Sequence, residues 1–128
     1  MKILITGKNG QLAQALVKQN SSKYNLISLS KDEFNLENHH TLKNQILFHK
    51  PDWIINTSCE HMSTLWYDSV DKDQLIVMQT NNSDEFDGHI NPCYTQKEMQ
   101  AKYPLSETLY VGALETPAYT RYMQIGYK

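Results

Sequence analysis

Residues 1–17, MKILITGKNGQLAQALV, constrain the fold more than any other stretch of the chain. The apolar run at 1–6 predicts a strand, and the apolar side chains between 12 and 16 recur with helical spacing. Between these two elements, two glycines and an alanine have the spacing G-x-x-G-x-x-A. A strand that ends at a glycine and turns directly into a helix is typical of the phosphate-binding turn of nucleotide-binding α/β domains.

Each small residue of this turn has a mechanical role. Gly7 permits a tight turn, Gly10 lets the backbone approach a pyrophosphate, and Ala13 lets the helix pack close to the strand. The pattern therefore predicts dinucleotide binding. The alternative interpretation is a glycine-rich connection between a strand and a helix that binds nothing.

The rest of the chain alternates strand and helix signals. Further strands are predicted at 24–29, 52–56 and 75–78. Further helices are predicted from Asn38 to a stop at Pro51, over 95–102, and over 107–114 after a cap at Ser106. Residues 57–73 have no clear period and are expected to form a loop. This order predicts an α/β fold, a Rossmann-like doubly wound parallel sheet abbreviated to about four strands, in a single domain over residues 1–128.

The overall composition excludes several classes of function. The chain has 12 basic and 14 acidic residues and a net charge of −2, which gives no electrostatic argument for nucleic acid or for an anionic membrane. No apolar run approaches the roughly 20 residues that span a bilayer. The chain enters a strand pattern directly from Met1, without the features of a signal peptide. We therefore expect a cytoplasmic protein with reduced thiols.

The sequence offers no clear metal-binding motif. The two cysteines lack metal-type spacing. The adjacent histidines at 39 and 40 would point to different sides of a helix. The tripeptide Cys-Glu-His at 59–61 is sequential, and no partner cluster for it is visible elsewhere. We therefore expect no metal site.

The end of the second predicted strand bears on the choice of cofactor. Enzymes that prefer NAD often carry an acidic residue there, which binds the ribose hydroxyls. Here Ser30 and Lys31 occupy that place, and Asp32 comes slightly later. This pattern favours NADP over NAD.

Further blocks resemble the dTDP-4-dehydrorhamnose reductases, sugar-nucleotide members of the extended short-chain dehydrogenase/reductase superfamily. ILITGKNGQL at 3–12 is similar to the family's cofactor turn, EFNL at 33–36 to its leucine/aspartate motif, and PDWIIN at 51–56 to its PDVVIN strand. VDK at 70–72 is similar to its VDKAE segment. FDG at 86–88, PCYT at 92–95 and PLS at 104–106 follow the family's order FDG, PYTE, PLN. The similar blocks span most of the chain.

The resemblance implies an NAD(P)H-dependent reductase of dTDP-4-dehydro-6-deoxy sugars, acting in dTDP-rhamnose biosynthesis on a nucleotide-sugar substrate. The cofactor contacts that it implies are Gly7, Asn9, Gly10, Gln11, Leu12, Ser30, Asn35 and Leu36. The family's active-site threonine, which polarises the sugar carbonyl, matches best at Thr80. Its proton-donating tyrosine matches best at Tyr110.

The chain also departs from the family. The family's tyrosine is followed four residues later by a lysine that lowers its pKa, whereas this chain has Leu114. The family's C-terminal substrate lobe and one crossover helix are missing. The loss of that helix leaves one face of a parallel sheet to be covered by the C-terminal segment 119–127, or by another subunit in a homo-oligomer or a complex with a partner. Three hypotheses therefore remain open: an enzyme, a catalytically impaired NAD(P)-binding or nucleotide-binding module, and a remnant without selected activity.

Overall fold

The computed structural model describes all residues except 31 and 34–37, and it describes His39 and Leu42 by their backbone alone. The strands are β1 (Lys2–Thr6), β2 (Asn25–Leu29), β3 (Trp53–Asn56), β4 (Leu75–Asn81), β5 (Glu107–Glu115) and β6 (Thr120–Tyr127). The helices are α1 (Gln11–Gln19), α2 (His39–His49), the 3-10 helix η1 (Cys59–His61), α3 (Leu65–Asp68) and α4 (Gln96–Lys102). No helix of this described part of the chain combines the length and the apolar character that crossing a membrane requires.

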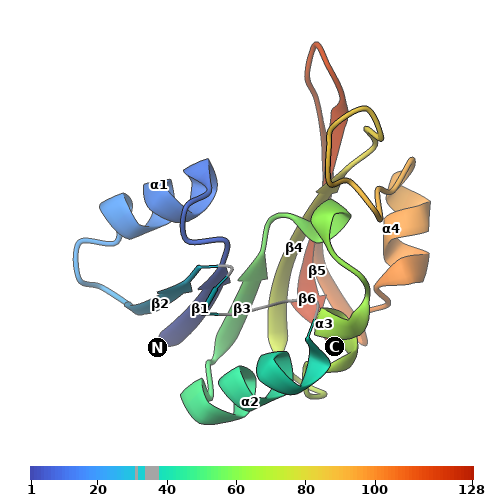
Figure 1. Ribbon diagram of the computed structural model, residues 1–128. Helices are drawn as coiled ribbons and strands as arrows, with labels where there is room; N and C mark the ends of the chain where they lie inside the picture. Colours follow the sequence, from blue (N-terminus) through green and yellow to red (C-terminus); the bar gives the residue numbers. More distant parts are fainter. Residues whose placement is uncertain (31, 34–37) are drawn as a thin grey trace.

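The strands form one six-stranded sheet in the order β2-β1-β3-β4-β6-β5 (Figure 1). The first four strands of that order are parallel. Strand β6 pairs antiparallel with β4, and β5 pairs antiparallel with β6 and forms the edge of the sheet. The four predicted strands are therefore confirmed, as is the α/β class. The sheet continues with two strands that the sequence pattern did not predict.

The two faces of the sheet carry separate hydrophobic clusters. On one face, Ala13 of α1 packs with Ile3, Ile5 and Ile55. On the other face, a larger cluster packs below α2, α3 and α4, and Ile46 of α2 belongs to it. Neighbouring residues of β1 and β3 alternate between the two clusters, as buried parallel strands do. This arrangement confirms the doubly wound prediction, because α1 and α2 lie on opposite faces.

The prediction of a helix over 107–114 is wrong, because this segment is strand β5. It pairs with β6 along a ladder from Glu107↔Tyr127 to Glu115↔Thr120. The connecting turn is closed by Thr116, whose amide and hydroxyl both donate to the carbonyl oxygen of Tyr119, at 2.9 and 2.6 Å. Side chains that favour strands on both arms of a hairpin outweigh the helix-capping signal that Ser106 gives when one arm is considered alone.

The prediction that segment 119–127 covers a sheet face is also wrong. The segment extends the sheet as β6, with Ile76↔Gly126 and Thr80↔Tyr122 among its pairs with β4. Coverage of a face by another subunit stays a prediction.

Tyr103 connects α4 to the rest of the fold. Its ring is fully buried and lies 5.6 Å, between centroids, from both Trp66 and Tyr67. Its hydroxyl accepts a hydrogen bond from Asn91 Nδ2 at 2.9 Å, and its carbonyl accepts one from Gln124 Nε2 at 2.8 Å. One residue thus joins α3, α4 and strand β6 through its ring, its hydroxyl and its backbone carbonyl.

Candidate functional site

The turn between β1 and α1 has the geometry that its small residues predict. Gly7 has φ +75°, in the left-handed region that favours glycine. Gly10 is extended and donates its amide to the Gly7 carbonyl oxygen at 2.7 Å. Ala13 is 2% exposed where α1 packs on the sheet. The chain therefore turns tightly, and α1 approaches β1 closely.

The amino end of α1 is open to a ligand. Its N-cap is Gly10, which has no side chain to satisfy the first amides of the helix. A Cβ at Gly10 would stand 3.1 Å from the Gly7 carbonyl oxygen, so any larger residue would crowd the turn. Free amides and the positive end of a helix dipole suit a pyrophosphate. Asn9 is exposed in this turn, and its carbonyl accepts a hydrogen bond from Gln14 Nε2 at 3.0 Å.

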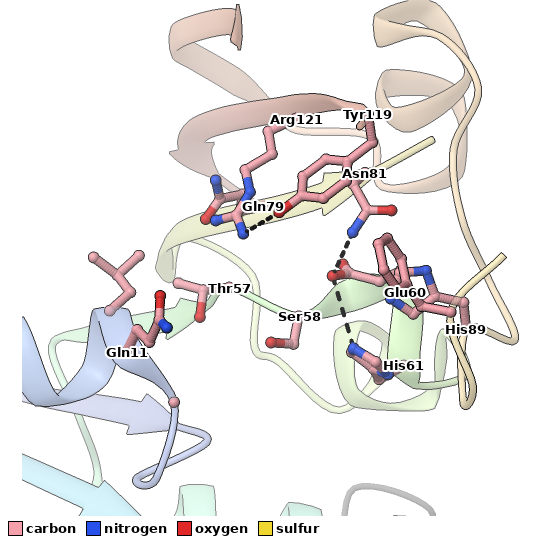
Figure 2. A pocket seen from close by; sticks show the side chains of 13 residues that line it. Gln11, Thr57, Ser58, Glu60, His61, Gln79, Asn81, His89, Tyr119 and Arg121 are labelled. Carbon is pink, nitrogen blue, oxygen red and sulfur yellow. Dashed lines mark hydrogen bonds and ion pairs between the residues drawn. The ribbon is translucent and has the colours of Figure 1, made fainter. Parts of the chain in front are cut away.

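A pocket of about 420 Å³ lies beside this turn, at the carboxyl ends of the parallel strands (Figure 2). Its lining residues are Gly10, Gln11, Leu12, Thr57, Ser58, Glu60, His61, Gln79, Asn81, Phe86, His89, Tyr119 and Arg121. The strand order reverses between β1 and β3, because the connection that leaves β1 runs to β2 on one side and the connection that leaves β3 runs to β4 on the other. Ligands of open α/β sheets bind where the connections diverge in this way.

One wall of the pocket carries a polar cluster of Glu60, His61, Asn81 and His89 (Figure 2). Asn81 Nδ2 donates to Glu60 Oε1 at 2.9 Å, and His61 Nε2 lies 4.0 Å from the same oxygen. The rings of His61 and His89 meet edge to face, with centroids 4.4 Å apart. Burial raises the pKa of the Glu60 carboxyl above its ordinary value, against the lowering effects of its backbone hydrogen bond and of the nearby basic side chains.

The β5–β6 hairpin adds a positive charge beside this cluster, since Arg121 of β6 pairs with Asn81 of β4. Arg121 is the single arginine of the sequence. Its Nη2 donates to the Tyr119 hydroxyl at 2.8 Å, and the guanidinium lies 5.3 Å from the centre of the Tyr119 ring. Sequence reasoning missed both residues because it did not predict the hairpin. The signal that could have found Arg121 is its position directly after a turn sequence.

The pair predicted to be catalytic lies outside this pocket. Gln79 and Asn81 line the pocket, so the intervening Thr80 points to the other face of β4, where it lies beside the Cys93 thiol. Tyr110 is half exposed on the edge strand β5, two strands across and three residues along from Thr80. Strand spacing separates the two Cα atoms by about 14 Å. The fold does not bring the two side chains together, and their catalytic role gains no support from it.

An acidic side chain, Glu33 of the EFNL block, lies beside the end of β2. Glu33 Oε2 accepts a hydrogen bond from the Ser30 amide at 2.9 Å and lies 3.8 Å from Lys8 Nζ in the turn. Hydrogen bonds from the Ser30 amide and hydroxyl, with the nearby Lys8 charge, lower the pKa of Glu33. The predicted contacts Asn35 and Leu36 lie outside the described residues.

The amino-terminal part of the chain matches a known protein family. Residues 1–83 match the protein family described as the RmlD substrate binding domain. No curated protein matches the chain.

Two solved structures of dTDP-4-dehydrorhamnose reductases are similar to the chain over part of its length. The one from Bacillus anthracis str. Ames, in complex with NADP, is 24% identical, with a TM-score of 0.42 over 47% of this chain and 23% of its own. The one from Clostridium acetobutylicum ATCC 824 is 29% identical, with a TM-score of 0.42 over 53% of this chain and 26% of its own. The chain thus spans about a quarter of the length of each of these structures.

Proposed function

Because the chain belongs to the RmlD substrate binding domain family, we propose that it binds a nicotinamide dinucleotide, NADP or NAD, in the pocket beside the turn of residues 7–10. The observation that carries the proposal is the coincidence of this turn with the pocket. Gly10, Gln11 and Leu12, which the sequence predicts as cofactor contacts, also line the pocket.

The residues present suit the proposed ligand. The uncapped amides at the start of α1 would hold the pyrophosphate, and Arg121 would supply a second positive element on the far wall. When bound, a reduced nicotinamide supplies a hydride. The protein's own task is then to position the dinucleotide and to present an acid to the acceptor.

The proton donor is the least supported part of a reductase reaction in this chain. Reduction of a dTDP-4-dehydro-6-deoxy sugar, the activity that the resemblance implies, needs a proton donor with a suitable pKa near the cofactor. Tyr110 lies outside the pocket, and four residues further along β5 stands Leu114. Residues four apart on a strand are about 13 Å from each other, so even a lysine at 114 would not adjoin Tyr110 as it would on a helix. We therefore favour a dinucleotide-binding module that does not reduce the sugar on its own.

A titration of NADPH fluorescence with the full chain tests the proposal. We expect saturable binding that Gly10→Trp weakens at least about tenfold, because the indole fills the approach to the turn. Val17→Trp is the matched control, since Val17 is a half-exposed residue of the same helix that does not line the pocket. Its affinity should stay within about twofold of the wild type. Absence of saturable binding by the wild type, or equal affinity of the two variants, would refute binding at this turn.

A second assay separates the module from the enzyme. NADPH oxidation is followed with a dTDP-4-dehydro-6-deoxy sugar at saturating cofactor. The module hypothesis expects no turnover above the background without protein. Turnover that disappears in Tyr110→Phe would establish the reductase instead.

A further inference from the structure

We propose that Glu60, His61 and His89 form a binding site for a divalent transition-metal ion, with zinc as the best fit. The three residues come from two separate segments, η1 and the loop that follows β4. One ligand atom from each of them lies within 4.8 Å of the other two. The proposal is independent of dinucleotide binding, since it concerns a different ligand and different side chains.

The hydrogen bonds of the two histidines leave one nitrogen of each ring able to bind a metal ion. His61 Nδ1 lies 3.1 Å from the Gly88 carbonyl oxygen, and His89 Nδ1 lies 2.5 Å from the Ser83 carbonyl oxygen. A carbonyl oxygen only accepts, so each Nδ1 must carry the proton. Each neutral ring then has its lone pair on Nε2. Histidines that bind metals are commonly oriented by such a bond from the other ring nitrogen to a backbone carbonyl.

Glu60 supplies the negative charge and an unused ligand atom. The residue is 6% exposed, and its Oε1 accepts the hydrogen bond from Asn81. Its Oε2 is buried without a hydrogen-bond partner in the described part of the chain. Burial of a carboxylate oxygen without a partner is unfavourable, and a cation bound at Oε2 would compensate it.

The donor set indicates which metal would bind. Two imidazole nitrogens and one carboxylate oxygen are a set that zinc accepts, and three protein ligands leave a fourth position for water or another oxygen ligand. That position would face the pocket, which all three residues line. Ligand atoms of tetrahedral zinc lie about 3.4 Å apart, so binding would draw the three groups together by up to about 1.4 Å.

The sequence analysis did not predict this site because one of its three ligands is distant in sequence from the other two. Glu60 and His61 are adjacent, but the third ligand lies beyond strand β4. The tautomers of both rings are fixed by backbone carbonyls, which no sequence motif records.

Metal titration of the full chain, first stripped with a chelator, tests the proposal. Zn²⁺ is titrated in competition with a chromogenic chelator, and Co²⁺ is used as a spectroscopic probe of coordination. We expect one equivalent to bind to the wild type, with the intense visible bands of four-coordinate Co²⁺. His89→Ala and His61→Ala should each weaken binding at least about tenfold, since each removes one of three ligands.

His40→Ala is the matched control, because His40 is an exposed histidine of α2 that lies outside the cluster. It should bind within about twofold of the wild type. Glu60→Gln keeps the shape of the buried side chain and should weaken Zn²⁺ binding while circular dichroism reports an intact fold. No binding by the wild type, or equal binding by the His89→Ala and His40→Ala variants, would overturn the proposal.

Discussion

The two glycines of the turn before α1 should respond differently to the same substitutions. Gly7 has φ +75° and open space where a Cβ would lie, with no atom within 4 Å. Gly10 has φ −72°, which any residue adopts, but its Cβ would stand 3.1 Å from the Gly7 carbonyl oxygen. Substitution at Gly7 therefore strains the backbone alone, whereas substitution at Gly10 strains a contact.

The magnitude at Gly7 follows from its dihedral angle. An alanine held in the left-handed region costs about 1–2 kcal/mol, and loss of glycine's freedom in the unfolded chain returns about 0.4–1 kcal/mol. Gly7→Ala should therefore reduce the free energy of unfolding by about 1 kcal/mol. Asparagine tolerates the left-handed region, so Gly7→Asn should lose about half as much or less. At Gly10, Asn should bring no such relief relative to Ala, because its Cβ meets the same oxygen.

Urea denaturation of the four variants measures these differences. With a slope of about 2 kcal/mol/M, a loss of 1 kcal/mol moves the midpoint by about 0.5 M, which is readily resolved. The informative comparison is Ala against Asn at each position, since each pair shares one backbone site. Equal midpoints for Gly7→Ala and Gly7→Asn, or recovery by Asn at Gly10 as well, would refute the assignment of conformational strain to Gly7.

Three further predictions concern other parts of the molecule. Gly126→Ala should destabilise the fold by about 3 kcal/mol, since its Cβ would overlap the Glu107 carbonyl oxygen of β5, and an unchanged urea midpoint would contradict the β5–β6 pairing. Burial raises the pKa of Tyr103, so the phenol stays protonated in the fold while the unfolded chain loses its proton above about pH 10. The stability that this phenol contributes is present below that pH and declines above it. Between pH 8 and 11 the urea midpoint of the wild type should therefore fall more steeply than that of Tyr103→Phe. Parallel declines of the two midpoints would contradict a raised pKa of Tyr103. Glu33→Gln should raise the affinity for NADPH relative to NADH several-fold in fluorescence titrations, because it removes a negative charge beside the turn, and an unchanged ratio would place the adenosine ribose elsewhere.

The elements that the sequence predicted correctly have local signals. The turn at Gly7, the strand at 52–56 and the cap at Asn38, whose side chain accepts from the Thr41 amide at 3.1 Å, each depend on a few neighbouring residues. Those signals come from turn conformation, apolar runs and capping, and the structure retains all three. They were sufficient to predict the four parallel strands of the sheet.

What the sequence did not predict depends on pairing between distant segments. Strand β5 has no buried face of its own, so neither strand nor helix periodicity identified it, and only its ladder with β6 does. The wall of the pocket that contains Arg121 follows from that ladder. The third proposed metal ligand, His89, is brought to Glu60 by the loop after β4. Contacts of this kind are set by tertiary structure and leave little trace in a single sequence.

Among the described strands, the hairpin that carries Arg121 pairs with the parallel part of the sheet along β4 alone. At the far end of that ladder the Asn82 amide donates to the Thr120 carbonyl oxygen at 3.2 Å, and the Thr120 amide donates to Asn82 Oδ1 at 2.8 Å. Beyond this point the tip of the hairpin can open without disturbing the rest of the sheet. Tyr119, which lines the pocket, lies in this tip. A ligand that contacts both Gly10 and Tyr119 would have to be released before the tip opens. Hydrogen exchange at the tip amides should therefore slow in proportion to occupancy, and it would report binding without any enzymatic assay.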